Sequence, residues 1–245
     1  MIRSVGIVGY GPFGKLVHAL VERFVPEAQV KVFSQRAAPD GALFFPLADV
    51  AACDAVVVCV PIHAFEATVE KLIPLLGWAT VLVDVSTVKL HAVEVLQRLM
   101  PERRWIAAHP MFGPESYEKQ GREVRGLRIV SCAHTLSQVE YRDIKRALEN
   151  VGFLIVEKSA DEHDRQLAET LFLTHYVGQI INKAGFKRTD IDTVSFGYLY
   201  DAVESVRNDT KLFEDVYAYN PYCKAVIEKF DEKEREVKRQ LLGNS

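Results

Sequence analysis

The sequence predicts an α/β protein in two parts: a doubly wound, mostly parallel sheet in residues 1–157, followed by a smaller all-helical domain in residues 158–245. Up to about residue 157, short β-branched runs alternate with segments of helical period, which is the pattern of βαβ units. After residue 158 the strand-like runs end, and helical periodicity with many aromatic residues takes over. A length of 245 residues allows one large domain or two small ones.

Individual elements follow from the spacing of apolar residues. The run at 55–60 (AVVVCV) is apolar without alternation, as expected for a central strand covered by helices on both faces. From Phe13 to Phe24 the apolar residues recur at i, i+3, i+4 and i+7, which predicts a helix packed on the sheet. No Gly/Ser linker separates the two domains, so a helix from about Ala160 should leave the sheet directly. The predicted strands are residues 4–8, 30–33, 55–60, 80–85, 105–108, 127–131 and 153–156.

Composition excludes several classes of function. The net charge is −3, so no basic excess favours a nucleic-acid partner, and a small metabolite is the better expectation. The four cysteines (Cys53, Cys59, Cys132 and Cys223) form no CxxC pair, which argues against a disulfide framework and against a metal site. We see no signal peptide and no apolar run long enough to cross a membrane, so we expect a cytoplasmic protein.

A glycine motif, Gly9-Tyr10-Gly11-Pro12-Phe13-Gly14, follows the first predicted strand and opens the first predicted helix. In a Rossmann-type dinucleotide site the first glycine makes the tight turn, the second admits the pyrophosphate and the third lets helix and strand pack closely. Pro12 suits the first helical turn, where its missing N–H costs nothing. The motif in this context predicts a nicotinamide dinucleotide cofactor, bound at the helix N-terminus.

The end of the second predicted strand distinguishes the two nicotinamide cofactors. An NAD enzyme places Asp or Glu there, on the ribose 2′-hydroxyl, whereas this chain has Ser34, Gln35 and Arg36. A hydroxyl and a guanidinium can bind a 2′-phosphate, and no carboxylate is present to repel it. The sequence therefore favours NADP over NAD.

Two polar segments lie at the carboxyl ends of adjacent predicted strands, which is where open α/β sheets bind ligands. One segment runs from Asp84 to Lys89 and contains Ser86; the other runs from Ala108 to Glu115 and begins with His109 and Pro110. His109 is the candidate general base, because an unperturbed imidazole titrates near neutral pH.

Together these segments resemble a known family, the prephenate/arogenate dehydrogenases of tyrosine biosynthesis, and most closely the plant-type arogenate dehydrogenases and their bacterial relatives. The resemblance covers nearly the whole chain. It rests on GYGPFG, on VPIH at residues 60–63, on DVSTVK at 84–89 and on HPMFGPE at 109–115, and further along on EHDR at 162–165 with Thr174-His175. The HPMFGPE loop combined with EHDR and a second histidine twelve positions after His163 is the specific part.

What the resemblance implies is an oxidative decarboxylation, in which hydride leaves the ring carbon that bears the 4-hydroxyl, the ring carboxylate departs as CO2 and the ring becomes aromatic. His109 matches the catalytic histidine and Ser86 its partner. Thr174 and His175 match substrate-binding positions, and His163 is expected to fix the interdomain helix. Val60, Pro61, His63, Pro110 and Met111 join the glycine motif and Ser34-Gln35-Arg36 as cofactor-binding positions.

One departure concerns the substrate's ring carboxylate, which many members bind with an arginine where this chain has Glu204. Arg207, one turn later, or Lys211 are the candidates to replace that arginine. Asp209 lies about where the plant-type enzymes carry an acid, which would pair with the ammonium that arogenate has and prephenate lacks. The sequence therefore favours arogenate over prephenate.

Other interpretations remain open at this point. The substrate can be prephenate instead, which leaves the resemblance to the family intact and removes only the role given to Asp209. A non-catalytic NADP-binding module is conceivable because a fold does not fix a function, although Ser86, His109 and His175 argue against it. An NADP reductase of imino or β-hydroxy acids would be expected to use a lysine in the helical domain. A homodimer formed through the helical domain is expected.

Overall fold

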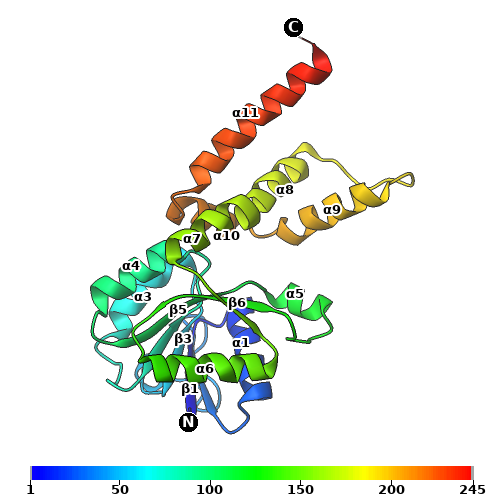
Figure 1. Ribbon diagram of the computed structural model, residues 1–245. Coiled ribbons are helices and arrows are strands. Elements are labelled where there is room, and N and C mark those ends of the chain that lie inside the picture. Colours follow the sequence, from blue (N-terminus) through cyan, green and yellow to red (C-terminus); the bar gives the residue numbers. More distant parts are fainter. Residues whose placement is uncertain (1, 244–245) are drawn as a thin grey trace. The chain divides into compact units, whose positions relative to one another are not determined.

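The computed structural model describes residues 2–243 and separates into two compact units (Figure 1). The first unit ends at His163 and the second begins at Asp164. Helix α7 (Ala160–Leu167) therefore contributes its first turn to the first unit, six residues beyond the boundary placed from the sequence. The units are described one at a time.

The first unit is built on a seven-stranded sheet of order β2-β1-β3-β4-β5-β6-β7. Neighbouring strands are parallel except β5 and β6, so the predicted doubly wound, mostly parallel sheet is confirmed. The strand order reverses at β1, because β2 lies on one side of it and β3 on the other. Sheets of this kind bind ligands in the crevice at such a reversal. The strands are β1 (Ser4–Val8), β2 (Gln29–Phe33), β3 (Ala55–Val58), β4 (Val81–Asp84), β5 (Arg104–Pro110), β6 (Arg128–His134) and β7 (Leu154–Glu157).

The reversed direction of β6 was not predicted, because alternation of apolar residues has the same period in both directions. Its pairing with β5 contains a register shift at Ala107/Ala108, immediately before His109. Such irregularities turn a strand locally and re-aim its side chains. The shift therefore lies where it can set the direction of His109.

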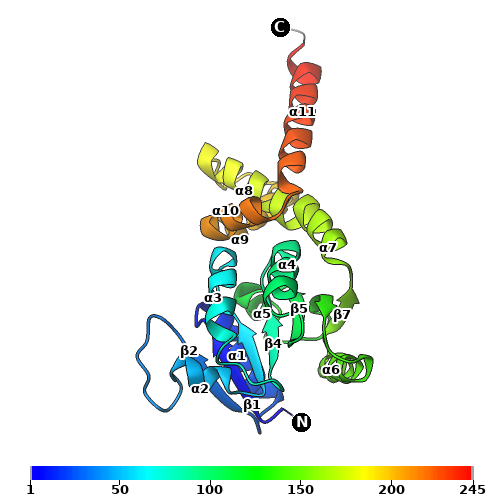
Figure 2. The ribbon, with the colours of Figure 1, turned by 90° about the vertical axis from the view of Figure 1, so that its left-hand side faces the viewer.

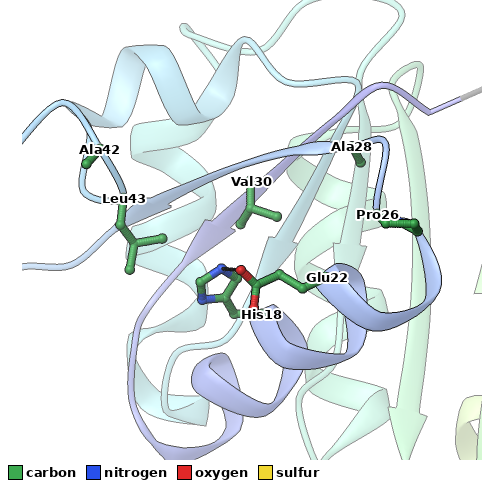
Figure 3. A pocket seen from close by; sticks show the side chains of 7 residues that line it. All are labelled: His18, Glu22, Pro26, Ala28, Val30, Ala42 and Leu43. Carbon is green, nitrogen blue, oxygen red and sulfur yellow. Dashed lines mark ion pairs between the residues drawn. The ribbon is translucent and has the colours of Figure 1, made fainter.

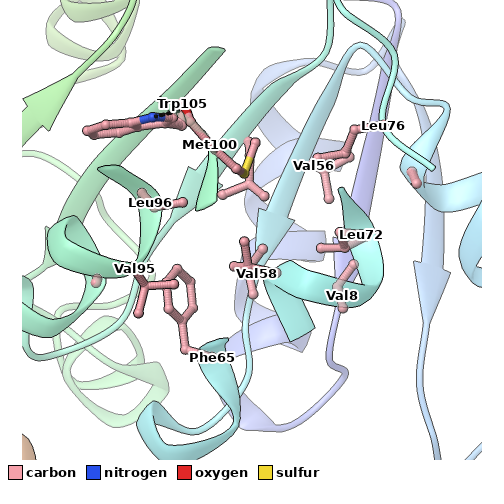
Figure 4. Packing of buried hydrophobic residues seen from close by; sticks show 14 of the residues in the cluster. Val8, Val56, Val58, Phe65, Leu72, Leu76, Val95, Leu96, Met100 and Trp105 are labelled. Carbon is pink, nitrogen blue, oxygen red and sulfur yellow. Dashed lines mark hydrogen bonds between the residues drawn. The ribbon is translucent and has the colours of Figure 1, made fainter. Parts of the chain in front are cut away.

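Side-chain alternation divides the core of this unit between the two faces of the sheet. Val56 and Val58 pack with the buried residues of the helices on one face, including Phe65 (Figure 4), whereas Val57 packs on the opposite face with Ile7. This two-sided burial explains the unbroken apolar run that predicted a central strand. Helices α2 (Leu47–Ala51), α3 (Phe65–Leu72) and α4 (Lys89–Leu99) cover the first face; α1 (Pro12–Phe24), α5 (Pro114–Lys119) and α6 (Gln138–Val151) cover the second.

The second unit is helical, as predicted. Its core is centred on Phe172, which is fully buried and stacks against Phe213 and Tyr217 at 5.3 and 6.1 Å between ring centres. Helices α8 (Leu173–Ala184) and α9 (Val194–Val206) approach closely, since a Cβ on Gly178 would lie 2.5 Å from a methyl group of Val206. A π-helical turn, η2 (Ala168–Phe172), joins α7 to α8, and α10 (Thr210–Tyr219) and α11 (Cys223–Leu242) complete the unit.

Within this unit α11 extends away from the group formed by α8, α9 and α10 (Figure 2). Its last four turns carry charged residues of both signs and are largely exposed. Between residues 2 and 243 none of the helices combines the length and the apolar character that crossing a membrane requires.

Candidate active site

The glycine motif adopts the geometry that each glycine was expected to provide. Gly9 has a φ of +98°, and a Cβ there would lie 2.4 Å from the carbonyl oxygen of Cys59. A Cβ on Gly14 would lie 2.1 Å from the carbonyl oxygen of Gly9, so the close packing of α1 on β1 requires glycine. Around the Cβ position of Gly11, in contrast, there is no atom within 4 Å. The motif therefore leaves an open approach at Gly11, which fits a pyrophosphate.

The start of α1 offers positive charge to that opening. Gly11 is the N-cap and provides no side chain, Pro12 is the first helical residue, and the first turn contains no acidic residue. The first N–H groups of the helix are therefore not capped by a side chain and carry the positive end of the helix dipole. Phe13 is half-buried and packs into the cluster around Leu16, which anchors the turn. These features fit a dinucleotide phosphate at this position.

The three residues after β2 form a turn at the edge of the sheet. The backbone N–H of Arg36 donates to Ser34 Oγ at 3.2 Å, and the side chains of Gln35 and Arg36 are exposed. The Arg36 guanidinium has no hydrogen bond or ion pair within residues 2–243. The carboxylate of Asp40, in the same loop, accepts the N–H groups of Ala42, Leu43 and Phe44, which hold the pKa of Asp40 below its usual range. The turn thus exposes the Arg36 guanidinium, and the Asp40 carboxylate in the same loop is already bound to backbone N–H groups.

The ends of β4 and β5 are joined by a buried ion pair that the sequence did not reveal. Asp84 and Lys89 are both fully buried and contact each other directly. The Lys89 ammonium also donates to the carbonyl oxygen of Ala108 at 2.6 Å, and Asp84 accepts the backbone N–H of Ser86 at 2.8 Å. One ion pair thus ties the turn carrying Ser86 to the strand end carrying His109. A lysine just after a strand is ordinarily exposed, so only the motif DVSTVK itself pointed to this position.

His109 is buried near the end of β5, with 6% of its surface exposed. Its Nδ1 lies 2.9 Å from Nε2 of His163, and the two rings meet edge to face at 71°. Burial is the main cause that lowers the pKa of His109 well below 6.5, and the nearby His163 and Lys89 lower it further. His109 is therefore neutral at pH 7, as a general base must be.

The side chain that contacts His109 in this structure is His163, while Ser86 stays the partner that the resemblance implies. The Ser86 hydroxyl donates to the carbonyl oxygen of Val88 at 3.2 Å, two residues along its own turn, and not to His109. His163, expected to fix the interdomain helix, makes this contact with His109. A short hydroxyl satisfies the nearest carbonyl first, whereas an imidazole reaching from a helix can span the distance between elements.

The remaining positions proposed for the cofactor lie in two loops of the first unit. Val60 is half-buried, and Pro61 and His63 are exposed at the short 3₁₀ turn η1 (Ile62–Ala64) after β3. Pro110 ends β5, and Met111 follows it with 40% of its surface exposed. In the part of the chain described, no group of three or more His, Cys, Asp or Glu side chains is arranged to hold a metal ion.

In the helical unit, His175 is buried and its Nδ1 has no hydrogen-bond partner within residues 2–243. Its ring lies parallel to that of Phe213, 6.2 Å between centres. Burial lowers the pKa of His175, and the charge of Asp209 acts in the opposite direction. Thr174 is exposed, and its hydroxyl donates to the Thr170 carbonyl within the helix. The Thr174 hydroxyl is therefore engaged within its own helix.

The two cations considered for the ring carboxylate are both engaged with acids. Arg207 forms an ion pair with Glu204 one turn earlier and donates to the Tyr200 hydroxyl at 3.2 Å. Lys211 lies 3.7 Å from Glu214 and 3.8 Å from Asp215. The Nε atom of Arg207 is buried without a partner among the described residues, so its guanidinium is only partly satisfied.

A separate cavity of about 600 Å³ lies beside α1 and β2 (Figure 3). Its polar lining consists of His18 and Glu22, 3.4 Å apart, and its other lining residues are apolar. His18 Nδ1 also contacts the hydroxyl of Tyr10 at 2.8 Å. None of the residues singled out from the sequence lines this cavity.

Comparisons with known proteins show what the chain is similar to. Residues 38–125 match the family model described as "Prephenate dehydrogenase, nucleotide-binding domain". The chain is 28% identical, over 98% of its length, to arogenate dehydrogenase 2 and to arogenate dehydrogenase 1 of Arabidopsis thaliana, both chloroplastic. The chain is therefore similar to prephenate and arogenate dehydrogenases over nearly its whole length. It spans 70% of the first of these two proteins and 39% of the second.

Solved structures show the same fold in a dehydrogenase of this group. Prephenate dehydrogenase from Aquifex aeolicus, in complex with hydroxyphenyl propionate and NAD+, has a TM-score of 0.77 at 19% identity. The likeness covers 99% of this chain and 91% of that chain. Residues 180–245 also match a family model described as "TYRAAT1-like, C-terminal domain".

Proposed function

We propose that the protein is an oxidoreductase that converts arogenate to tyrosine by oxidative decarboxylation, with NADP as hydride acceptor. The relationship to prephenate and arogenate dehydrogenases supports the family of reactions. The observation that carries the chemistry is His109, a buried neutral imidazole at the carboxyl end of β5, in the same sheet as the open glycine turn.

The protein's part in the reaction follows from the contacts of His109. Its Nδ1 is engaged by His163, so Nε2 is the ring nitrogen that accepts the proton of the substrate's 4-hydroxyl. Lys89, paired with Asp84, donates to the Ala108 carbonyl and so fixes the end of β5 that carries His109. The bound nicotinamide ring would supply the site that takes up hydride. The burial of His109 keeps it neutral and ready to accept a proton at pH 7.

The preference for NADP rests on the turn after β2. Arg36 is exposed and unengaged among the described residues, and no carboxylate ends the strand. We expect Arg36→Ala to weaken NADP binding by about 1.5–3 kcal/mol, which is the range for a hydrogen bond to a charged group, and to leave NAD binding nearly unchanged. Equal losses for the two nucleotides, measured by fluorescence titration, would remove Arg36 from the proposal.

The preference for arogenate rests on Asp209, whose charge acts on the buried His175. A carboxylate paired with the substrate ammonium favours arogenate over prephenate by roughly ten- to a hundredfold. Asp209→Asn should therefore move the ratio of kcat/KM values toward prephenate, whereas Asp201→Asn, which removes an exposed acid of α9 paired with Arg188, should not. An unchanged ratio in Asp209→Asn contradicts this role.

Prephenate dehydrogenase activity, giving 4-hydroxyphenylpyruvate, is the second candidate. It is favoured by the fold shared with the prephenate dehydrogenase of Aquifex aeolicus. The two candidates use the same His109 and differ only at the side chain of the substrate.

The deciding experiment is an initial-rate panel of arogenate or prephenate with NADP or NAD, followed by nicotinamide absorbance. Turnover with arogenate and NADP supports the whole proposal, and turnover with prephenate keeps the family while discarding the role of Asp209. His109→Asn should lower kcat by about 10²–10⁴ without weakening nucleotide binding. No turnover in any of the four combinations, in protein that still binds NADP, would instead support a non-catalytic nucleotide-binding module.

We also propose that the helical unit forms a homodimer. Several large apolar side chains of α8, α9 and the segment between them are exposed, among them Ile191 at 86% and Val194 and Tyr198 at 73% each. Exposed apolar residues gathered on neighbouring segments are typical of an interface. Light scattering coupled to size exclusion tests this, and a monomer of 27.6 kDa at micromolar concentration contradicts it.

A further inference from the structure

A general base must present an unprotonated nitrogen, and in a neutral imidazole the hydrogen bond at one nitrogen decides which one that is. In water the Nε2-protonated form of histidine predominates, which would turn Nε2 of His109 into a donor. If His109 takes its proton on Nε2, its Nδ1 must carry hydrogen and must donate it to an acceptor. The only partner recorded for Nδ1 of His109 among the described residues is Nε2 of His163, at 2.9 Å.

Three features of the first unit place His163 at that distance. Lys158, just after β7, donates its N–H to the Ser131 carbonyl of β6, which fixes the end of β7 against the sheet. Ser159 then caps α7: its hydroxyl accepts the Glu162 N–H, and the Glu162 carboxylate accepts the Ser159 N–H. This reciprocal arrangement is a capping box, and His163 is the next residue, one turn into the helix.

Burial protects the contact between the His109 and His163 rings from competition by water. His163 has 4% and His109 6% of its surface exposed, so water cannot replace either partner at low cost. The charged groups facing His109 are His163 from α7 and Lys89 from α4, and Asp84 of β4 contacts Lys89. No carboxylate contacts the His109 ring within residues 2–243, so the orienting role that an acid plays beside many catalytic histidines falls to the imidazole of His163.

We propose that His163 is a positioning residue for His109: its Nε2 accepts the Nδ1 hydrogen of His109 and so holds His109 in the tautomer whose Nε2 can take a proton. This inference rests on the proposed function for its effect on rate, but the tautomer itself is measurable without turnover. His163 touches neither substrate nor cofactor in this role.

The test compares two substitutions at one position. In His163→Gln the amide oxygen replaces Nε2 as acceptor, and in His163→Leu no acceptor remains. His134→Gln is the matched control, because His134 is a partly buried histidine of β6 that stacks on Tyr141 and has no contact with His109. The readouts are the nitrogen chemical shifts of ¹⁵N-labelled histidine, with His109 assigned through His109→Gln, the affinity for NADP, and kcat as a function of pH.

We expect wild-type protein and His163→Gln to show His109 protonated on Nδ1, and His163→Leu to show the Nε2-protonated form or a mixture. His163→Leu should lower kcat by about ten- to a hundredfold, the equivalent of one hydrogen bond to a group that becomes charged, with NADP affinity unchanged. His163→Gln should retain most of the activity. Because glutamine cannot carry the positive charge that disfavours protonation of His109, the pKa of His109 should rise, and the acid limb of kcat/KM should move to higher pH.

Two results overturn the inference. One is a wild-type His109 protonated on Nε2, which would make His163 the donor. The other is a His109 tautomer that is the same in His163→Leu as in wild type. If the tautomers behave as expected while no substrate is turned over by wild-type protein, the proposed function fails and the positioning of His109 by His163 stands.

Discussion

The buried pair of Asp84 and Lys89 gives the largest stability effect that the structure predicts. Both side chains are fully buried, and Lys89 also donates to the carbonyl oxygen of Ala108. In Lys89→Met the carboxylate of Asp84 remains in the core with only the Ser86 N–H as a recorded partner. Leaving one charge of a buried pair uncompensated costs about 3–5 kcal/mol, which for a chain of this size corresponds to a fall in Tm of roughly 6–20 °C.

Urea unfolding followed by tryptophan fluorescence reports on this unit directly, because Trp78 and Trp105 both lie in it. The double variant Asp84→Asn/Lys89→Met removes both charges and should recover at least half of the loss. Lys224→Met, which removes an exposed lysine of α11, should change stability by less than about 0.5 kcal/mol. A loss below about 1 kcal/mol in Lys89→Met, or a double variant no more stable than the single one, refutes the assignment of a coupled buried pair.

Three further predictions use other features of the first and second units. Gly11→Ala should fold with an unchanged Tm, because the space at Gly11 is open, but its methyl group would occupy the proposed pyrophosphate position and weaken NADP binding at least tenfold. Gly14→Ala should lower the Tm itself, because its Cβ would overlap a carbonyl oxygen. Equal Tm values for the two variants contradict this. Burial keeps the pKa of His109 below 6.5 in the folded protein, so below pH 6.5 the unfolded chain binds more protons at this residue. As the pH falls below 6.5, the free energy of unfolding should therefore decrease by up to about 1.4 kcal/mol per pH unit from this residue. Urea titrations at several pH values compare this pH dependence in wild type and His109→Asn, and the difference in pH dependence should vanish above pH 7.5. Burial raises the pKa of Cys59 and of Cys223 to about 12, so neither thiol should react with a disulfide reagent at pH 8 until the protein is unfolded; rapid labelling of either residue in native protein, seen by peptide mass spectrometry, would show that it is accessible.

Much of the fold could be predicted because the signals are local. The two-sided burial of Val56, Val57 and Val58 leaves an apolar run in the sequence, and the switch from strand to helix after the glycine motif is marked by Pro12. The direction of β6 could not be predicted in this way. An antiparallel strand of this composition has the same alternation as a parallel one, and its direction depends on how the chain returns after α5.

The candidate site was harder to predict where it depends on contacts between distant residues. The position of His109 at a strand end is visible in the sequence, but its contact with His163 joins residues 54 positions apart. Lys89 looks like a surface lysine by type and is fully buried because Asp84 and a backbone carbonyl satisfy it. The local bond of the Ser86 hydroxyl to Val88 depends on the turn geometry, which no spacing rule specifies.

The π-helical turn at Ala168–Phe172 has a consequence for comparing this chain with others. A π-helical turn holds one residue more than an α-helical turn, so it commonly records a single inserted residue in an ancestral α-helix. One residue corresponds to about 100° of rotation around a helix axis. The π-helical turn takes up the extra residue locally, so the helix after it keeps its rotation, and a homologue with one residue fewer and an α-helical turn here would keep its equivalent of His175 in the same place. A one-residue gap at this turn in an alignment would thus mark the loss of the π-helical turn, with the residues after it still aligned in space.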